Sequence, residues 1–266
     1  MTLHIDDPHR PDDVDTGTAI LLVHGFGLSS RVWEPMRGFL DPRRRVVAVD
    51  TRGHGRSGAA ASYTLTAMVD DLVGLIEALG LDRPLVVGSS LGAVAATELA
   101  HARPDLVGAA VLIGSMGHSM VVEPDFVAAN RAMAAGLEVD VEATMAATVP
   151  GWFGVLGSPA VTSWAVREAL LQQPGISAFV DSVTGWDPRP YLPRVGVPLH
   201  YLHGRHDPIP LEVVREDAAL SPDATLTVAE HAGHMPHVES PGWTAGFVEQ
   251  HARTLHAGRH GTDPIP

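Results

Sequence analysis

One short stretch constrains the fold more than any other part of the chain. Residues 84–100, PLVVGSSLGAVAATELA, place an apolar strand pattern directly before an alanine-rich helix pattern, so the chain must reverse direction in a very tight turn. Gly88 and Gly92 stand two residues before and two after Ser90, where strand and helix backbones must approach closely. The spacing predicts Ser90 at the apex, its hydroxyl exposed beside the positive end of a helix, and a structural role for Ser89. The alternative is that Ser90 only caps the helix.

The rest of the chain repeats the alternation of strand and helix patterns. Continuous apolar runs are typical of strands that are buried on both faces of a parallel sheet. They occupy residues 18–25, 45–50, 84–89, 106–114, 197–204 and 224–230, and helix patterns occupy about 65–79, 91–102, 211–220 and 243–256. This order predicts a doubly wound α/β fold with a mostly parallel sheet.

The pattern changes between residues 115 and 186, where no strand is evident. Helical segments at about 125–135, 138–147, 159–172 and 176–185 predict a helical cap over one edge of the sheet. Its methionines and tryptophans either pack the insertion or line a ligand pocket, and the pocket candidates are Met116, Met120, Trp152 and Trp186. We therefore expect a core of residues 1–114 and 187–256, a cap of residues 115–186, and a disordered tail of residues 257–266.

Composition excludes several classes of function. The formal net charge of −13 disfavours nucleic acid and anionic membranes as partners. No apolar run approaches the roughly 18 residues that a membrane span needs, and the acidic, proline-broken start lacks a signal-peptide profile, which predicts a cytoplasmic protein. The absence of cysteine excludes a thiolate nucleophile, and the absence of lysine excludes Schiff-base chemistry. No phosphate loop or dinucleotide motif is present, so no cofactor is implied.

A serine nucleophile needs a base, and the base needs an acid that fixes its tautomer. For this type of turn the expected chain order is Ser, then Asp or Glu, then His, with both partners just after later strands. Asp207 follows the strand at 197–204, and His234 follows the strand at 224–230. Asp50 comes too early in this order, and Asp187 precedes its strand rather than following it. Asp207 and His234 are therefore the predicted acid and base.

Two other motifs in the sequence compete with this assignment. The spacing of His231, His234 and His237 allows a metal-binding interpretation, but Gly233 and Pro236 break the helix that would align them, so no metal site is predicted. GHSMV at residues 117–121 resembles the serine turn, but it has Val121 where the turn needs glycine. We therefore assign no catalytic role to Ser119.

Acyl transfer also requires hydrogen-bond donors for the developing oxyanion. The backbone N–H of Leu91, directly after the nucleophile, is the first candidate. The second is the N–H of Phe26 in HGFG at residues 24–27, where the glycines let the backbone turn its N–H groups inward, and His24 is expected to brace this loop.

These separated motifs together resemble those of a known family. HGFGLSSRVWEPM, VDTRGHGRS, VGSSLG, HGRHDPIP and AGHMPHVESP look like motifs of the α/β-hydrolase superfamily, over residues 18 to 253. The resemblance implies the α/β-hydrolase fold with an inserted helical cap, a nucleophile at Ser90, an acid at Asp207, a base at His234, and an oxyanion hole at Phe26 and Leu91. DTRGHG, the tryptophan of SRVWEPM, and WDPRPYLPRVGVP are similar to 3-oxoadipate enol-lactonases and their esterase relatives. The short, proline-rich amino terminus departs from the family pattern and predicts the loss of a strand at that edge.

The sequence is compatible with three functions. The first is a serine hydrolase that cleaves an ester, a lactone or a similar small acyl substrate through an acyl-enzyme. The second is a carbon–carbon bond hydrolase, an acyl transferase or a cyclase of secondary metabolism that uses the same three residues under a different cap. The third is a non-catalytic module that binds a small molecule under the cap.

Overall fold

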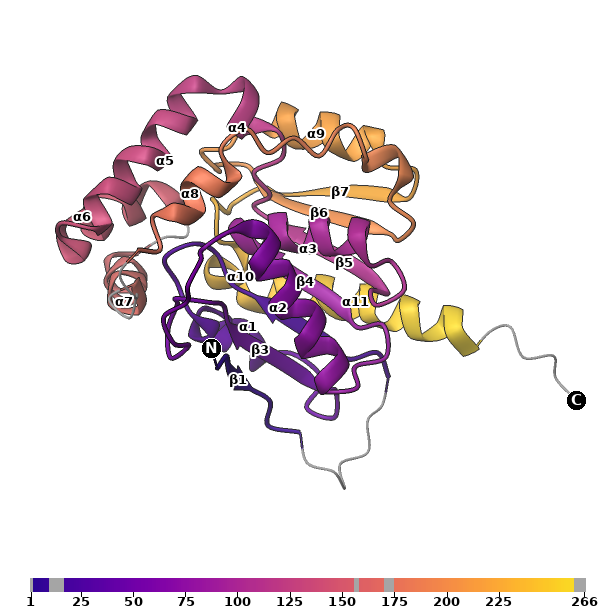
Figure 1. Ribbon diagram of the computed structural model, residues 1–266. Helices are drawn as coiled ribbons and strands as arrows, with labels where there is room; N and C mark the ends of the chain where they lie inside the picture. The colour runs from indigo at the N-terminus through magenta and orange to yellow at the C-terminus, as the bar shows by residue number, and fades with distance from the viewer. Residues whose placement is uncertain (1, 10–16, 156–157, 170–174, 261–266) are drawn as a thin grey trace, which may run out of the picture.

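The computed structural model describes residues 2–9, 17–155, 158–169 and 175–260, and its centre is a seven-stranded sheet (Figure 1). The strand order is β1-β3-β2-β4-β5-β6-β7, and every neighbouring pair is parallel except β1 with β3. The strands are β1 (His4–Asp6), β2 (Ile20–Val23), β3 (Val46–Asp50), β4 (Leu85–Ser89), β5 (Ala109–Ile113), β6 (Leu199–Gly204) and β7 (Ala224–Ala229). The predicted mostly parallel α/β sheet is confirmed.

Helices cover both faces of the sheet, which explains why β2 to β5 are buried along their whole length and almost entirely apolar. Alternate residues of a strand point to opposite faces. In β2, Leu21 and Val23 therefore join one apolar cluster, and Ile20 and Leu22 join the other. The first cluster lies under α2 (Leu65–Ala78), α3 (Leu91–Ala102) and α9 (Leu211–Leu220), and the second under α1 (Glu34–Arg37) and α11 (Pro241–His260).

The strand β1 was missed by the sequence patterns, which predicted the loss of a strand at this edge. It has three residues, of which only Ile5 is apolar, and it pairs antiparallel with β3. The backbone N–H of His4 also donates a hydrogen bond of 2.8 Å to Ser57 Oγ, in the turn after β3. Long-range pairing therefore holds a segment that has little strand propensity of its own.

The insertion between β5 and β6 is helical, as predicted, and forms the group of helices at the upper left of Figure 1. Its helices are α4 (Ser119–Val122), α5 (Pro124–Leu137), α6 (Val141–Thr148), α7 (Pro159–Ala169) and α8 (Ala178–Val183). The division of the chain at residues 115 and 186 into core and cap stays a prediction.

The last helix, α11, is longer than its sequence pattern indicated. It extends through His260, so residues 257–260 are helical where a disordered tail was expected, and residues 261–266 lie outside the described part of the chain. Among the helices in that part, none combines the length and the apolar character that crossing a membrane requires.

Candidate active site

The turn between β4 and α3 has the strained geometry that its glycines predicted. Ser90 has φ 53° and ψ −115°, and only Arg83 among the other non-glycine residues in the described ranges has a positive φ. A Cβ atom added to Gly88 would lie 2.2 Å from the carbonyl oxygen of Gly92, and one added to Gly92 would lie 2.2 Å from the carbonyl oxygen of Val23. Neither position has room for a side chain, so this backbone path requires both glycines.

Two further strands bring the predicted acid and base to the same edge of the sheet. Asp207 lies just after β6, and His234 lies in residues 230–235 after β7, called here the histidine loop. His234 Nδ1 lies 2.9 Å from Asp207 Oδ2 and 3.1 Å from Oδ1, and the N–H of Ile209 donates to Oδ1 at 2.9 Å. Because an ionised carboxylate only accepts, Nδ1 must carry the hydrogen, which leaves Nε2 of neutral His234 as a proton acceptor.

The electrostatics of this pair favour an ionised acid and a basic imidazole. Burial of His234 opposes its charged form, but the charge and hydrogen bond of Asp207 outweigh burial and raise the pKa of His234 above its usual value. Burial likewise opposes the charge of Asp207, yet the charge and hydrogen bond of His234 hold the pKa of Asp207 below its usual value. The two groups therefore stabilise each other's charged form.

A cavity of about 250 Å³ joins the predicted nucleophile to the predicted base. Its lining includes Ser90 and His234, the two predicted oxyanion-hole residues Phe26 and Leu91, and two of the four pocket candidates, Met116 and Trp152. Six of the nine residues singled out in the sequence thus border one space, and Asp207 adjoins it through His234.

The structure does not bring the other two pocket candidates, Met120 and Trp186, to this cavity. Met120 is 3% exposed and belongs to the core cluster on the α2 and α3 face of the sheet. The indole Nε1 of Trp186 donates a hydrogen bond of 2.6 Å to Glu98 of α3, which also accepts from the hydroxyl of Tyr191. Trp186 thus fastens the chain after α8 to the core.

The loop that carries Phe26 packs directly on the serine turn. A Cβ atom on Gly25 would lie 3.2 Å from Ser90 Cβ, so the loop packs closely against Ser90. His24, which is buried, donates from Nδ1 to the Gly25 carbonyl at 2.7 Å and accepts the Thr51 N–H at Nε2, at 3.0 Å. This is the bracing role expected of it, and burial lowers its pKa. The N–H of Leu91 belongs to the first turn of α3, where no intrahelical acceptor exists.

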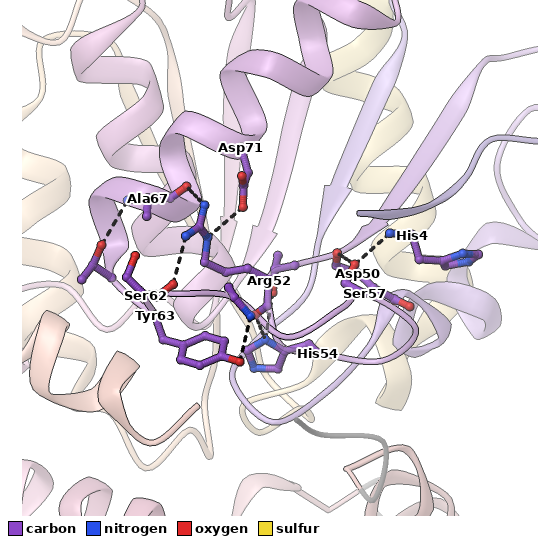
Figure 2. Close-up of polar contacts among 12 residues, drawn as sticks. His4, Asp50, Arg52, His54, Ser57, Ser62, Tyr63, Ala67 and Asp71 are labelled. Atoms are coloured by element: carbon purple, nitrogen blue, oxygen red, sulfur yellow. Dashed lines mark hydrogen bonds and ion pairs between the residues drawn. The ribbon is translucent and has the colours of Figure 1, made fainter. Parts of the chain in front are cut away.

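The turn after β3 contacts this loop through Thr51, and Figure 2 shows other polar contacts of the same turn. Asp50, which the chain order excluded as the acid, is buried and accepts the N–H of Ser30 at 2.6 Å and that of Arg56 at 2.8 Å. Arg52 pairs with Asp71 of α2 at 2.8 Å and donates to the carbonyl of Ala67 in α2 and to that of Ser62 before it (Figure 2). Asp50 thus joins the segments after β2 and β3 as a structural residue, and Arg52 joins the segment after β3 to α2.

Several lining residues escaped the sequence patterns. Helix α5 presents Phe126, Ala129, Asn130 and Met133 to the cavity, and α8 presents residues 179, 180 and 183. Their spacing of three and four residues is that of one helical face, so an apolar stripe on each helix was the available signal. None of the described residues that line the cavity is Asp, Glu or Arg.

Comparison with known proteins finds chains of similar sequence and similar fold. A sequence profile described as the "Alpha/beta hydrolase family" matches residues 20–247. A pimeloyl-[acyl-carrier protein] methyl ester esterase of Aliivibrio salmonicida is 27% identical over 232 residues, which cover 84% of this chain and 87% of that protein.

Solved structures share the fold of this chain. A thermophilic esterase from Thermogutta terrifontis, with malate bound, superposes with a TM-score of 0.83 at 27% identity and covers 96% of this chain and 94% of its own. The enol-lactonase from Burkholderia xenovorans LB400 shares the fold, with a TM-score of 0.80 at 23% identity and coverage of 93% and 95%.

Proposed function

The chain belongs to the alpha/beta hydrolase family, and from this premise we propose that it hydrolyses small, uncharged acyl esters or lactones through Ser90, His234 and Asp207. The two esterases and the enol-lactonase named above support an ester hydrolase. The observation that carries the proposal is the meeting of three features at one cavity: a serine on a positive-φ turn, a histidine, and a buried carboxylate on that histidine's Nδ1.

In the proposed first half-reaction, Ser90 Oγ attacks the substrate carbonyl carbon while His234 Nε2 accepts the hydroxyl proton. Asp207 stabilises the imidazolium that forms, and the N–H groups of Phe26 and Leu91 bind the oxyanion. When the tetrahedral intermediate collapses, the bond from the carbonyl carbon to the alkoxy oxygen breaks. The alcohol leaves with the proton from His234, and the acyl group remains on Ser90.

The second half-reaction repeats these steps with water as the nucleophile. His234 removes a proton from water, the hydroxide attacks the acyl carbon, and the same two N–H groups bind the second oxyanion. Ser90 then departs with the proton that His234 held. The products are the free acid and the restored enzyme, so atoms and charges balance with no cofactor in the reaction.

The lining of the cavity supports the choice of uncharged acyl groups. Apolar side chains such as Phe126, Met133 and Phe179 surround the space in front of Ser90. Because the described lining offers no cationic arginine, a carboxylate at the far end of an acyl chain would lose water without gaining a partner.

Two p-nitrophenyl esters with six-carbon acyl chains test this selectivity. We expect kcat/KM for the hexanoate to exceed that for the adipate monoester by about a hundredfold or more, because burying the terminal carboxylate costs several kcal/mol. The rates of alkaline hydrolysis of the two esters serve as the control for intrinsic reactivity. Equal kcat/KM values would contradict the uncharged-substrate proposal and leave the assignment of the nucleophile intact.

Labelling with a fluorophosphonate tests the nucleophile itself. Attack by Ser90 Oγ forms an oxygen–phosphorus bond and expels fluoride, so we expect one adduct per chain on the peptide that contains residue 90. Ser119→Ala is the matched control, because the Ser119 hydroxyl is buried, has no hydrogen-bond partner among the described residues and does not line the cavity. An adduct elsewhere, or none, would count against the proposed function.

A further inference from the structure

One carboxylate outside the three proposed catalytic residues joins the cap to the histidine loop. Glu239 ends the short helix α10 (Pro236–Glu239), which directly follows that loop. Its Oε1 accepts the N–H of Gly233 at 2.8 Å and that of Met235 at 3.3 Å, on the two sides of His234. Its Oε2 accepts the N–H of Gly154 at 2.7 Å, from the cap, 85 residues away in the chain.

The same two segments also touch through their backbones. The N–H of His234 donates to the carbonyl oxygen of Trp152 at 2.6 Å. A Cβ atom on Gly233 would lie 2.5 Å from that oxygen and 2.5 Å from the nitrogen of Gly154, and a Cβ on Gly154 would lie 2.7 Å from the nitrogen of Gly233. The cap segment 152–154 and the histidine loop are thus in direct contact, with no space for a side chain between them.

This contact connects the wall of the cavity to the proposed base. Trp152 lines the cavity, and its ring lies 6.3 Å from the His234 ring, centroid to centroid. A shift of segment 152–154 would therefore move a wall of the cavity and release the backbone N–H of His234 at the same time.

The charged and titratable groups around His234 come from two of the elements packed against it, β6 with the loop after it and α10. Asp207 follows β6 and contacts Nδ1, and His203 lies on β6 itself, where burial lowers its pKa. On α10, burial lowers the pKa of His237 to about 3, so this residue is neutral. Burial raises the pKa of Glu239, and the ionised Glu239 carboxylate in turn raises the pKa of His234. Segment 152–154 and the glycine after β5 carry no titratable side chain.

We propose that Glu239 is a positioning residue of the active site, whose single carboxylate holds segment 152–154 of the cap and the histidine loop in one arrangement. This inference rests on the proposed function, because it assigns His234 as the base. Glu239 acts through the backbone N–H groups that it binds. Both the position of the cap segment and the orientation of His234 therefore depend on this one carboxylate. In a purely structural role, Glu239 would contribute to folding stability without any effect on the kinetics of the folded enzyme.

The test compares Glu239→Gln with Glu98→Gln in the full-length enzyme, with p-nitrophenyl hexanoate as substrate. The glutamine at 239 keeps one acceptor oxygen but turns an NH₂ group toward backbone donors, so it breaks either the cap contact or the loop contact. A displacement of catalytic groups by about 1 Å can lower the rate of an enzyme about a hundredfold. We therefore expect kcat/KM of Glu239→Gln to fall about 10- to 100-fold, with a higher KM and a lower kcat. The acid limb of the pH profile should also move to lower pH, because the variant lacks a charge that raises the pKa of His234.

Glu98 is the matched control because it also joins a later segment to the core, through Trp186 and Tyr191, but it does not line the cavity. Glu98→Gln should lower the melting temperature and leave kcat/KM and the pH profile as in the unaltered enzyme. If Glu239→Gln behaves in the same way, its role is structural only and the proposal is wrong.

A second variant keeps the test decisive if Glu239→Gln does not fold. Gly154→Ala places a methyl group against the histidine loop and separates the two segments while the charge of Glu239 remains. We expect a higher KM and a lower kcat with no displacement of the acid limb, and kinetics like those of the unaltered enzyme would overturn the proposal. Fluorophosphonate labelling of the unaltered enzyme separates the two hypotheses: failure to label Ser90 contradicts the proposed function, whereas normal labelling with unaffected variants contradicts only the positioning role.

Discussion

Replacement of Ser90 by alanine should lower kcat for p-nitrophenyl hexanoate by about 10⁴- to 10⁶-fold, because it removes the proposed nucleophile and leaves only the oxyanion donors and the binding cavity. The rate that remains should not show a burst of p-nitrophenol, since no acyl-enzyme forms. Pre-steady-state absorbance at enzyme concentrations near that of the substrate measures both quantities. The melting temperature should stay close to that of the unaltered enzyme, because serine and alanine are equally strained at φ 53°.

Two companion variants separate a missing nucleophile from a damaged fold. Ser90→Gly removes the same hydroxyl and relieves the positive φ, so it should be inactive yet more stable, by about 1 kcal/mol. Ser119→Ala should retain full activity, because its hydroxyl lies away from the cavity. Substantial turnover by Ser90→Ala would refute the proposed mechanism.

Replacement of Asp207 by asparagine should lower kcat/KM by about 10⁴-fold. The asparagine side chain can donate from its NH₂ group to Nδ1 of His234, which would place the imidazole proton on Nε2, the atom that must accept the proton of Ser90. The Ile209 N–H, which donates to Oδ1, can still bond the amide oxygen, so the loop should keep its place. Steady-state kinetics across pH, with circular dichroism as the check on folding, measure the effect.

The pH dependence has a definite sign. His234 must be neutral to accept a proton, so kcat/KM should fall as pH drops through its raised pKa and should level off above it. Loss of the Asp207 charge removes the main factor that raises this pKa, so the acid limb of the remaining activity should move to lower pH. Asp187→Asn is the matched control, because Asp187 pairs with Arg189 and does not contact His234. An unmoved limb in Asp207→Asn would contradict the proposed pair.

The glycine spacing around Ser90 was sufficient to predict the serine turn, because the clash that Gly88 avoids is with Gly92, four residues away. The clash that Gly92 avoids is with the carbonyl oxygen of Val23 on β2, and only the packed sheet shows it. The positions of Asp207 and His234 followed from a rule of topology, since loops after parallel strands meet at one edge of the sheet. Neither line of reasoning gave the 2.9 Å contact between them or the tautomer that it sets. Those depend on how β6 and β7 lie side by side.

The cap shows where sequence patterns were insufficient. Met116 and Met120 are four residues apart and of the same type, and both belong to the same core cluster, yet only Met116 also lines the cavity. Likewise Trp152 borders the cavity, whereas Trp186 bonds to Glu98 on α3. The direction of each side chain depends on the residues that pack or hydrogen-bond with it from distant parts of the chain. Composition does not identify those residues.

By itself the sequence determined what depends on near neighbours: the alternation of strands and helices, the tight turn at Ser90, and the placement of Asp207 and His234 after later strands. Steric exclusion and side-chain periodicity act over a few residues, so they can be read directly from the chain. Only the tertiary structure decided the lining of the cavity, the pairing of β1, and the contact of Glu239 with Gly154. Contacts of this kind join distant segments, and they exist only after the sheet and the cap have packed together.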